Sequence, residues 1–169
     1  NQIEIGCEFA YISVSYPDIK MIEPTSYLGV DRNSTSHVLV ASNIQTGKVL
    51  KLGKSCKHIH NKYKEIRRQL GKKKKLKKLK SIKNREQRIV RNINHQISKA
   101  LVDRCVKDNS AIVLENLKGI RKAKSRRKSR YTLNSWSFYQ LQLMIEYKSK
   151  KQGIPIFYVE PQYTSQRCS

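Results

Sequence analysis

The chain has 169 residues, and its 36 Lys and Arg against 12 Asp and Glu give a formal net charge of +24. This length suits one domain with a core of its own, and the charge calls for a polyanionic partner, usually nucleic acid, rather than a small-molecule substrate. No apolar run approaches the roughly 20 residues of a membrane span and no signal-peptide pattern opens the chain, so we expect a cytoplasmic, nucleoid-associated protein and exclude a membrane protein.

The first third of the chain is rich in strand signals. Alternating apolar residues predict a strand over 10–16, which Pro17 ends. After a turn-rich link, three further strands are predicted over 27–31, 37–42 and 48–52, and the segment NIQTGK joins the last two as a hairpin turn. Short consecutive strands with tight turns indicate an antiparallel meander.

The next segment, 54–108, predicts a basic helical hairpin inserted into the sheet. Its second half has one apolar residue in every four, with Val90 and Ala100 alongside, as expected for an amphipathic helix with one buried face. The residues of this stripe are Ile89, Ile93, Ile97, Leu101 and Cys105.

The last part returns to alternating strands and helices. The segment 110–117 predicts a buried strand, and 118–132 a basic linker with little apolar content. A helix is predicted over 134–152, with Trp136, Tyr139, Leu143 and Tyr147 on one stripe, and Trp136 and Tyr139 are interpreted as core residues. The closing segment GIPIFYVEP predicts a short strand. This order predicts a mixed sheet with helices on both faces.

The positive charge is concentrated in two stretches. Residues 54–91 contain seventeen Lys or Arg against two Glu, and residues 118–130 contain eight and no acid. Each phosphate that they neutralise releases counterions, so binding should weaken steeply as salt rises. A solvated lysine-rich surface without a partner is the alternative. The residues expected to contact phosphates are Arg67, Arg68, Lys72, Lys73, Lys74, Lys75, Lys77, Lys78, Arg121, Lys122, Arg126 and Arg127.

Two acidic residues end predicted strands. Along 27–31, Gly29 and Asp31 share one face and Gly29 leaves room there, while Val113 and Glu115 share a face of the later strand. If these strands are parallel neighbours, the two carboxylates lie side by side and repel unless a cation lies between them. Mg²⁺ suits such a pair, because it takes one or two carboxylates and accepts substrate phosphate oxygens. In basic surroundings this pattern points to two-metal phosphodiester hydrolysis.

Simpler interpretations of these residues stay open. Asp31 could begin a turn with Asn33, and Glu115 could cap its strand or pair with a lysine. The cluster CKHIH at 56–60 lacks a fourth ligand, and helical residues two apart point in different directions, so we expect no zinc site there. The four cysteines contain no CxxC, which favours a reducing compartment over a disulfide scaffold. Because the chain opens with Asn1 rather than Met, we expect a piece of a longer protein.

Three segments together resemble a known family. YLGVDRN followed by a hairpin, then IVLENLKGI, then NSWSFYQLQLMIEYKSKKQGIPIFYVEPQYTSQRCS look like the RuvC-type nuclease domain of the TnpB (OrfB) transposon proteins, relatives of the type V CRISPR nucleases. The resemblance covers nearly the whole chain, and its last segment is the most specific. It implies an α/β, RNase H-like fold over residues 1–169: a mixed sheet with flanking helices and the basic helical insertion between its third and fourth strands. It also implies DNA cleavage that depends on Mg²⁺ or Mn²⁺ and is guided by a transposon-encoded RNA.

The resemblance assigns roles to individual residues. Asp31 matches the first catalytic aspartate and Glu115 the catalytic glutamate, both as metal ligands. The segment 163–169 matches the start of the family's zinc ribbon, so Cys168 would be the first of four Zn²⁺ ligands in the full-length protein. Glu160 matches an acid that is not assigned to catalysis, and we interpret it as structural.

The chain also departs from the family. It ends before the remaining cysteines and the third catalytic aspartate, and Asn33 replaces a glycine beside the metal loop. We therefore expect this chain alone to bind nucleic acid with little cleavage. Two alternatives are a DNA transposase or resolvase on the same fold without a guide RNA, and a non-catalytic basic nucleic-acid-binding protein.

Overall fold

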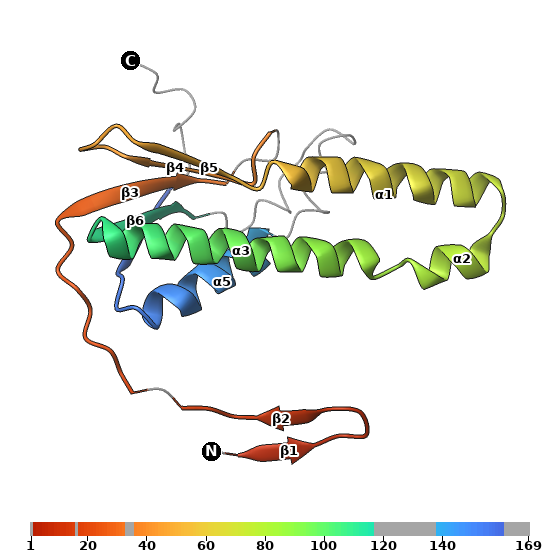
Figure 1. Ribbon diagram of the computed structural model, residues 1–169, viewed down its shortest axis with the longest axis horizontal. Coiled ribbons are helices and arrows are strands. Elements are labelled where there is room, and N and C mark those ends of the chain that lie inside the picture. Colours follow the sequence, from red (N-terminus) through yellow and green to blue (C-terminus); the bar gives the residue numbers. More distant parts are fainter. Residues whose placement is uncertain (1, 16, 33–35, 117–137, 161–169) are drawn as a thin grey trace.

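The computed structural model describes residues 2–15, 17–32, 36–116 and 138–160 (Figure 1). Its centre is a five-stranded mixed sheet in the order β5-β4-β3-β6-β7. The strands are β3 (Ser26–Asp31), β4 (Leu39–Asn43), β5 (Val49–Leu52), β6 (Ser110–Glu115) and β7 (Ile156–Val159). The first three form the predicted antiparallel meander, and β6 and β7 add to β3 in parallel.

Helices fill the segment between β5 and β6. They are α1 (Ser55–Lys72), α2 (Leu76–Ser81) and α3 (Arg85–Lys107). Figure 1 shows α1 beyond the sheet with the first part of α3 beside it and α2 at their far end, while the rest of α3 runs along β6. We call these three helices the basic arm.

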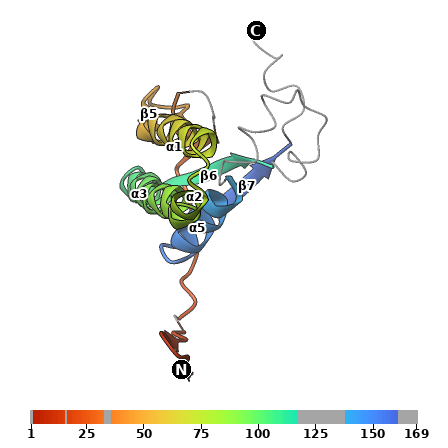
Figure 2. The same ribbon diagram turned by 90° about the vertical axis from the view of Figure 1, so that its right-hand side faces the viewer.

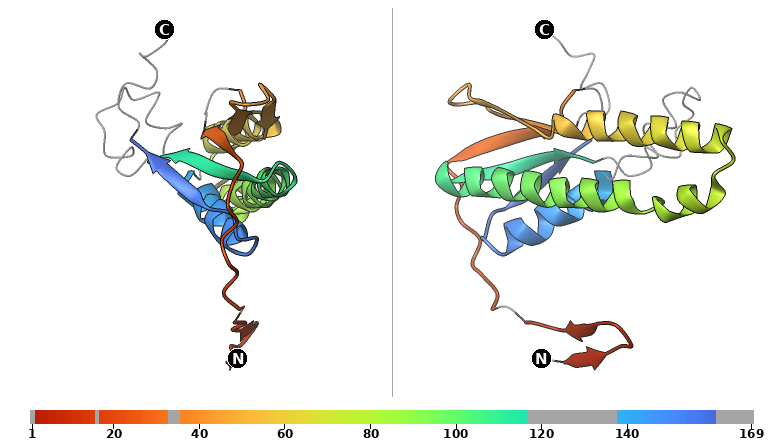
Figure 3. Two further views of the ribbon diagram at one scale, coloured as in Figure 1. Left: turned by 90° about the vertical axis from the view of Figure 1, so that its left-hand side faces the viewer. Right: turned by 45° about the vertical axis from the view of Figure 1, so that its right-hand side comes forward.

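The last described helix, α5 (Phe138–Lys150), packs against α3 and leads into β7. Figure 2 and Figure 3 show α3 and α5 on the same side of β6 and β7. Residues from α1, α3, α5 and the sheet share one core on that side. In the part of the chain that the structure describes, the helices therefore cover one face of the sheet, and the expectation of helices on both faces is wrong there.

The opposite face of the sheet carries side chains that remain exposed. Tyr27, Phe157 and Val159 are 43–48% exposed, and the rings of Tyr27 and Phe157 lie 6.0 Å apart. These residues alternate with buried ones such as Leu28 and Leu114, because successive residues of a strand point to opposite faces. We call this side of the sheet the open face.

The helix α5 buries a different stripe from the predicted one. Leu141 and Ile145 lie in the core, whereas Tyr139 is 64% exposed and Leu143 43%. The interpretation of Tyr139 as a core residue is therefore wrong, and Trp136 lies outside the described residues. Two apolar stripes compete on this helix, and the aliphatic one packs without a hydroxyl that would need a partner.

The first part of the chain differs from its prediction. It forms a separate hairpin of β1 (Ile3–Ile5) and β2 (Ala10–Ile12), and both strands are exposed along their whole length. The predicted strand over 10–16 is therefore shorter, and its alternation does not reflect a buried face. In α3, Ile97, Leu101 and Cys105 are buried as predicted, but Ala100 is exposed.

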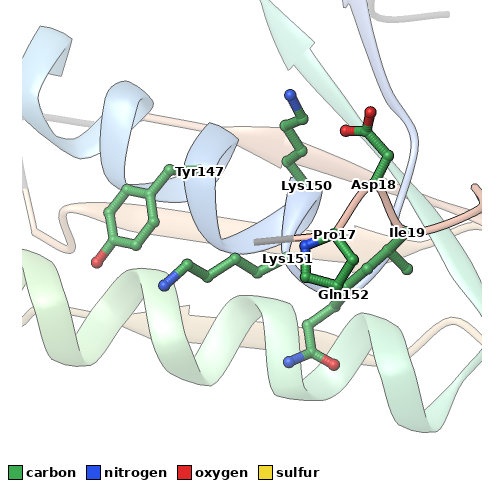
Figure 4. Close-up of a pocket in the computed structure, with 7 residues that line it drawn as sticks. All are labelled: Pro17, Asp18, Ile19, Tyr147, Lys150, Lys151 and Gln152. Atoms are coloured by element: carbon green, nitrogen blue, oxygen red, sulfur yellow. The ribbon is translucent and has the colours of Figure 1, made fainter. Parts of the chain in front are cut away.

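A cavity of about 540 Å³ lies where the segment after the hairpin meets the end of α5 (Figure 4). Pro17, Ile19 and Tyr147 supply its apolar wall, and Asp18, Lys150 and Lys151 its charges. The turn that follows α5 enters β7 at the amino-terminal edge of the parallel strands, so this cavity lies at the edge opposite to Asp31 and Glu115.

Among the described helices, none is both long enough and apolar enough to cross a bilayer.

Candidate metal and nucleic-acid site

The two candidate catalytic carboxylates come from neighbouring parallel strands. The paired register of β3 and β6 runs to Val30 and Leu114, and the next residue on each strand is Asp31 and Glu115. Neighbouring strands lie about 4.8 Å apart, so the backbones of the two acids are adjacent at the carboxyl ends of the strands. The condition on which the metal prediction depended, that the two strands are parallel neighbours, is met.

Both carboxylates belong to the open face. Asp31 is exposed and Glu115 is half-buried, and Gly29 precedes Asp31 on the same face. A Cβ atom on Gly29 would meet nothing closer than the Ser42 carbonyl oxygen at 3.8 Å, which is an ordinary contact. The glycine is therefore not what creates the room; the open face itself leaves the carboxylates accessible to a large substrate.

The donor set suits a hard divalent cation. Mg²⁺ and Mn²⁺ take carboxylate oxygens and keep several waters, and Asp31 and Glu115 supply carboxylates from adjacent strand ends. Within the described residues, no group of three His, Cys, Asp or Glu could hold a metal ion.

The Glu160 carboxylate follows β7 and accepts a hydrogen bond from Asn116 Nδ2 at 3.1 Å, which agrees with a structural role.

The CKHIH segment does not form a metal site in the structure. Cys56 is buried in the core, where burial raises the pKa of its thiol to about 11. His60 instead lies with Nδ1 2.9 Å from Oε1 of Glu86.

One polar network behind the carboxylates was not predicted. Arg32 is buried beside the acids and donates to the Glu115 carbonyl oxygen and to Gln142 of α5. Burial lowers the pKa of Arg32. Burial and a hydrogen bond to Glu146 raise the pKa of Tyr158 to about 12. Strand alternation was the available signal, because it places position 32 on the core face, where an arginine is unusual.

The predicted phosphate contacts divide into two groups within the basic arm. Arg67 forms an ion pair with Glu86, and Arg68 forms one with Glu65. The lysines at the end of α1 and in α2 point into solvent, which leaves them accessible to phosphates. These exposed residues are Lys72, Lys73, Lys74, Lys75, Lys77 and Lys78. The predicted contacts Arg121, Lys122, Arg126 and Arg127, and the predicted zinc ligand Cys168, lie outside the described residues.

This arrangement of strands and helices defines an α/β domain with a RuvC-like fold, and solved structures share it. A cryo-EM structure of a CRISPR-Cas12f ternary complex matches with a TM-score of 0.69 at 22% identity, over 95% of this chain and 33% of that chain. A cryo-EM structure of a Cas12f1–sgRNA–target DNA complex matches with a TM-score of 0.63 at 22% identity, over 90% of this chain and 33% of that chain. The expected fold is confirmed.

Sequence comparisons show which proteins this chain is similar to. Residues 138–169 match the Cas12f1-like TNB domain family. The TnpB-like protein MJ0751 of Methanocaldococcus jannaschii is 33% identical over 171 residues, which cover 92% of this chain and 61% of that protein. The CRISPR-associated endodeoxyribonuclease Cas12f1 of Syntrophomonas palmitatica is 30% identical over 180 residues, 97% of this chain and 35% of that protein. The chain is a relative of the TnpB-like and Cas12f proteins, and it spans less than two thirds of either of these relatives.

Proposed function

We propose that this chain is the RuvC-like part of an RNA-guided DNA endonuclease whose full-length form hydrolyses phosphodiester bonds with a divalent cation. The observation that carries the proposal is the adjacency of Asp31 and Glu115 at the carboxyl ends of two parallel strands, on a face that a nucleic acid can reach. The relationship to TnpB-like and Cas12f proteins supports the same reaction class.

Asp31 and Glu115 are the residues that would hold Mg²⁺ or Mn²⁺. When bound, the cation supplies Lewis-acid activation of the attacking water and stabilises charge on the leaving oxygen. The two carboxylates would hold the cation on the open face, and the exposed lysines of the basic arm would hold the phosphate backbone. Lysine contacts of this kind carry no sequence information, so sequence selection is left to base pairing with a guide RNA.

The isolated 169-residue chain should bind nucleic acid and cut little. The described residues supply two neighbouring acids and no cluster of three potential ligands, whereas the cation pair of a two-metal hydrolysis needs more oxygen ligands than two carboxylates provide. A Zn²⁺ site that includes Cys168 stays a prediction for a longer form of the protein.

Titration with Mn²⁺, followed by electron paramagnetic resonance of the free ion, tests the carboxylate pair directly. Asp31→Asn and Glu115→Gln should each weaken Mn²⁺ binding at least about tenfold, since each removes one charged ligand. Asp18→Asn is the matched control, because Asp18 is an exposed acid at the opposite edge of the sheet. If the wild-type chain shows no saturable Mn²⁺ binding, or if Asp31→Asn leaves it unchanged, the chain is a non-catalytic basic nucleic-acid-binding protein instead.

Two further measurements test the partners and the level of activity. Copurification with one defined RNA supports a guide, and its absence from the full-length protein would favour a transposase or resolvase on the same fold. Sustained Mg²⁺-dependent cutting of DNA by the purified chain, abolished by Asp31→Ala, would overturn the expectation that this chain alone cuts little.

A further inference from the structure

Arg32 occupies an unusual position directly behind the carboxylate pair. It follows Asp31 in the chain, and strand alternation turns its side chain to the core face, where it is only 6% exposed. Its Nη2 donates to the backbone carbonyl oxygen of Glu115, and its Nη1 donates to Oε1 of Gln142 at 2.9 Å. One guanidinium thus joins the ends of β3 and β6 to the helix α5.

The partner of Arg32 on α5 is itself held in place. Gln142 Nε2 donates to Oε1 of Glu146 at 2.9 Å and lies 3.2 Å from the Tyr158 hydroxyl oxygen. Tyr158, on β7, donates its hydroxyl proton to the same oxygen of Glu146. The network therefore extends from the strand of Asp31 across α5 to β7, and Glu146 and Tyr158 fix the rotamer of Gln142 that faces Arg32.

Each acid is paired on its outer side in the sheet, Asp31 with Val40 of β4 and Glu115 with Val159 of β7. The register of β3 with β6 ends at Val30 and Leu114, one residue before Asp31 and Glu115. The bond from Arg32 to the Glu115 carbonyl oxygen continues the attachment at the point where the paired register stops. Arg32 thus adds a direct link between the ends of β3 and β6, beside the pairing of each acid with its outer strand.

Packing alone does not call for an arginine at this position. Burying a charge costs several kcal/mol even when it is paired, and replacing such a group by an apolar one is often neutral or stabilising. Within the described residues, Arg32 Nε has no hydrogen-bond partner, which adds to that cost. What the guanidinium provides, and an apolar side chain cannot, is a planar fork that bonds two acceptors in fixed directions.

We propose that Arg32 is the positioning residue of the Asp31–Glu115 pair: its fork fixes the Glu115 backbone relative to β3 and α5, so that both carboxylates face one divalent cation. This inference rests on the proposed function and adds to it the residue that sets the geometry of the metal site. Arg32 does not contact the cation; it acts through the backbone that carries one ligand.

Mn²⁺ affinity of the full 169-residue chain, measured by electron paramagnetic resonance, tests this role with three variants. Arg32→Met removes the fork and the charge, Arg32→Lys keeps the charge but not the fork, and Gln142→Leu removes only the partner on α5. We expect both Arg32 variants to weaken Mn²⁺ binding by about 10- to 100-fold, the usual effect of losing a group that orients a metal ligand. Gln142→Leu should also weaken Mn²⁺ binding, but by less than the Arg32 variants do.

Lys148→Met is the matched control. Lys148 Nζ also bridges two elements, because it donates to the His95 carbonyl oxygen at 2.6 Å and to Ser98 Oγ at 2.7 Å, far along α5 from Gln142. This variant should lower the melting temperature without changing Mn²⁺ affinity, which separates positioning from general stability.

Each outcome decides between the proposals. If Asp31→Asn abolishes Mn²⁺ binding but both Arg32 variants bind as the wild type does, the positioning role is wrong and the proposed function stands. If Arg32→Lys keeps wild-type affinity while Arg32→Met loses it, charge rather than the fork matters, and the positioning role is again overturned. If neither Arg32 variant folds, Gln142→Leu decides: unchanged affinity in that variant overturns the role. Absence of saturable Mn²⁺ binding by the wild type overturns the proposed function and leaves no metal pair to position.

Discussion

Glu86 in the first turn of α3 and His60 of α1 are joined across the basic arm, with Oε1 and Nδ1 2.9 Å apart. The second oxygen of the same carboxylate accepts a hydrogen bond from Arg67, also on α1. One acid on α3 thus holds two side chains of α1. The arm carries a large excess of positive charge, so the two helices repel each other over much of their length, and Glu86 opposes this repulsion.

Replacing this carboxylate should destabilise the arm. Glu86→Gln removes the charge from a site that is only 13% exposed and leaves Arg67 without its ion-pair partner there, so we expect a loss of about 1–3 kcal/mol in the free energy of unfolding. Urea denaturation followed by circular dichroism measures it. Glu65→Gln is the control, since the Glu65–Arg68 pair is exposed and should contribute no measurable stability. Equal effects of the two variants would show that Glu86 does not join the helices.

The turn between β5 and α1 depends on a glycine. Gly53 has a φ of +79°, and a Cβ atom there would lie 2.6 Å from Cγ2 of Val38 and 2.7 Å from Cδ1 of Ile97. Gly53→Ala should therefore cost about 2–4 kcal/mol, from backbone strain together with overpacking of the core. Gly47→Ala is a matched control, because Gly47 has a φ of +65° but nothing within 4 Å of its Cβ position. It should show the strain alone, about 1 kcal/mol, by the same denaturation measurement.

The positions of the two acids could be predicted because their strands are short apolar runs with a carboxylate at one end. In strand 27–31 alternation alone assigns Asp31 to a face, and a crossover of the length of 54–108 allows 110–117 to lie parallel to it. What the sequence did not decide is which strand is the neighbour. That depends on long-range packing of Leu28 against Ile112, which no local pattern encodes.

Other features could not be read from local patterns. In α5, Tyr139 and Leu141 both lie on apolar stripes, and only the shape of the α3 surface selects the stripe with Leu141 for burial. The exposed N-terminal hairpin has the alternation of a half-buried strand and no core against which to pack. Arg32 was missed because a charged residue after a strand is usually assigned to a loop, whereas here Gln142 and the Glu115 carbonyl compensate its burial in part.

Salt dependence should separate the lysines of the basic arm from other surface charges. Replacing Lys73, Lys74, Lys77 and Lys78 together by Gln should reduce the magnitude of the slope of log K against log salt for a short duplex by roughly 3.6, because each lost phosphate contact removes about 0.9 of a released counterion. Fluorescence anisotropy at several salt concentrations measures the slope.

The control for this prediction removes the same charge elsewhere. Lys48, Lys51, Lys107 and Lys150 are exposed residues that lie outside the predicted contact group, and their joint replacement by Gln should change the slope clearly less. If both quadruple variants change it equally, the chain binds through its net charge, and the arm is not a defined contact surface.

The buried cysteine of α3 should make stability fall at high pH. Cys105 is fully buried, and burial raises the pKa of its thiol to about 12, whereas an unfolded cysteine has a pKa of about 8.5. The folded protein thus keeps a proton that the unfolded chain loses. The protonated thiol therefore contributes to the free energy of unfolding. This contribution is fully present below pH ~8.5 and is lost as the pH rises toward 12.

Urea denaturation of the wild type and of Cys105→Ala at pH 8 and at higher pH isolates the contribution of this thiol. The stability advantage of the wild type over Cys105→Ala should shrink by about 1.4 kcal/mol for each pH unit between the unfolded and folded pKa of the thiol, because only the wild type carries this thiol. Lys148, whose pKa burial lowers, acts in the opposite sense but equally in both proteins, so it cancels from the difference. Cys7→Ala, at an exposed cysteine, should follow the wild type at every pH. A constant difference between the wild type and Cys105→Ala would mean that this thiol ionises as easily in the folded chain as in the unfolded one, and that the contact of α3 with the sheet opens to solvent around Cys105.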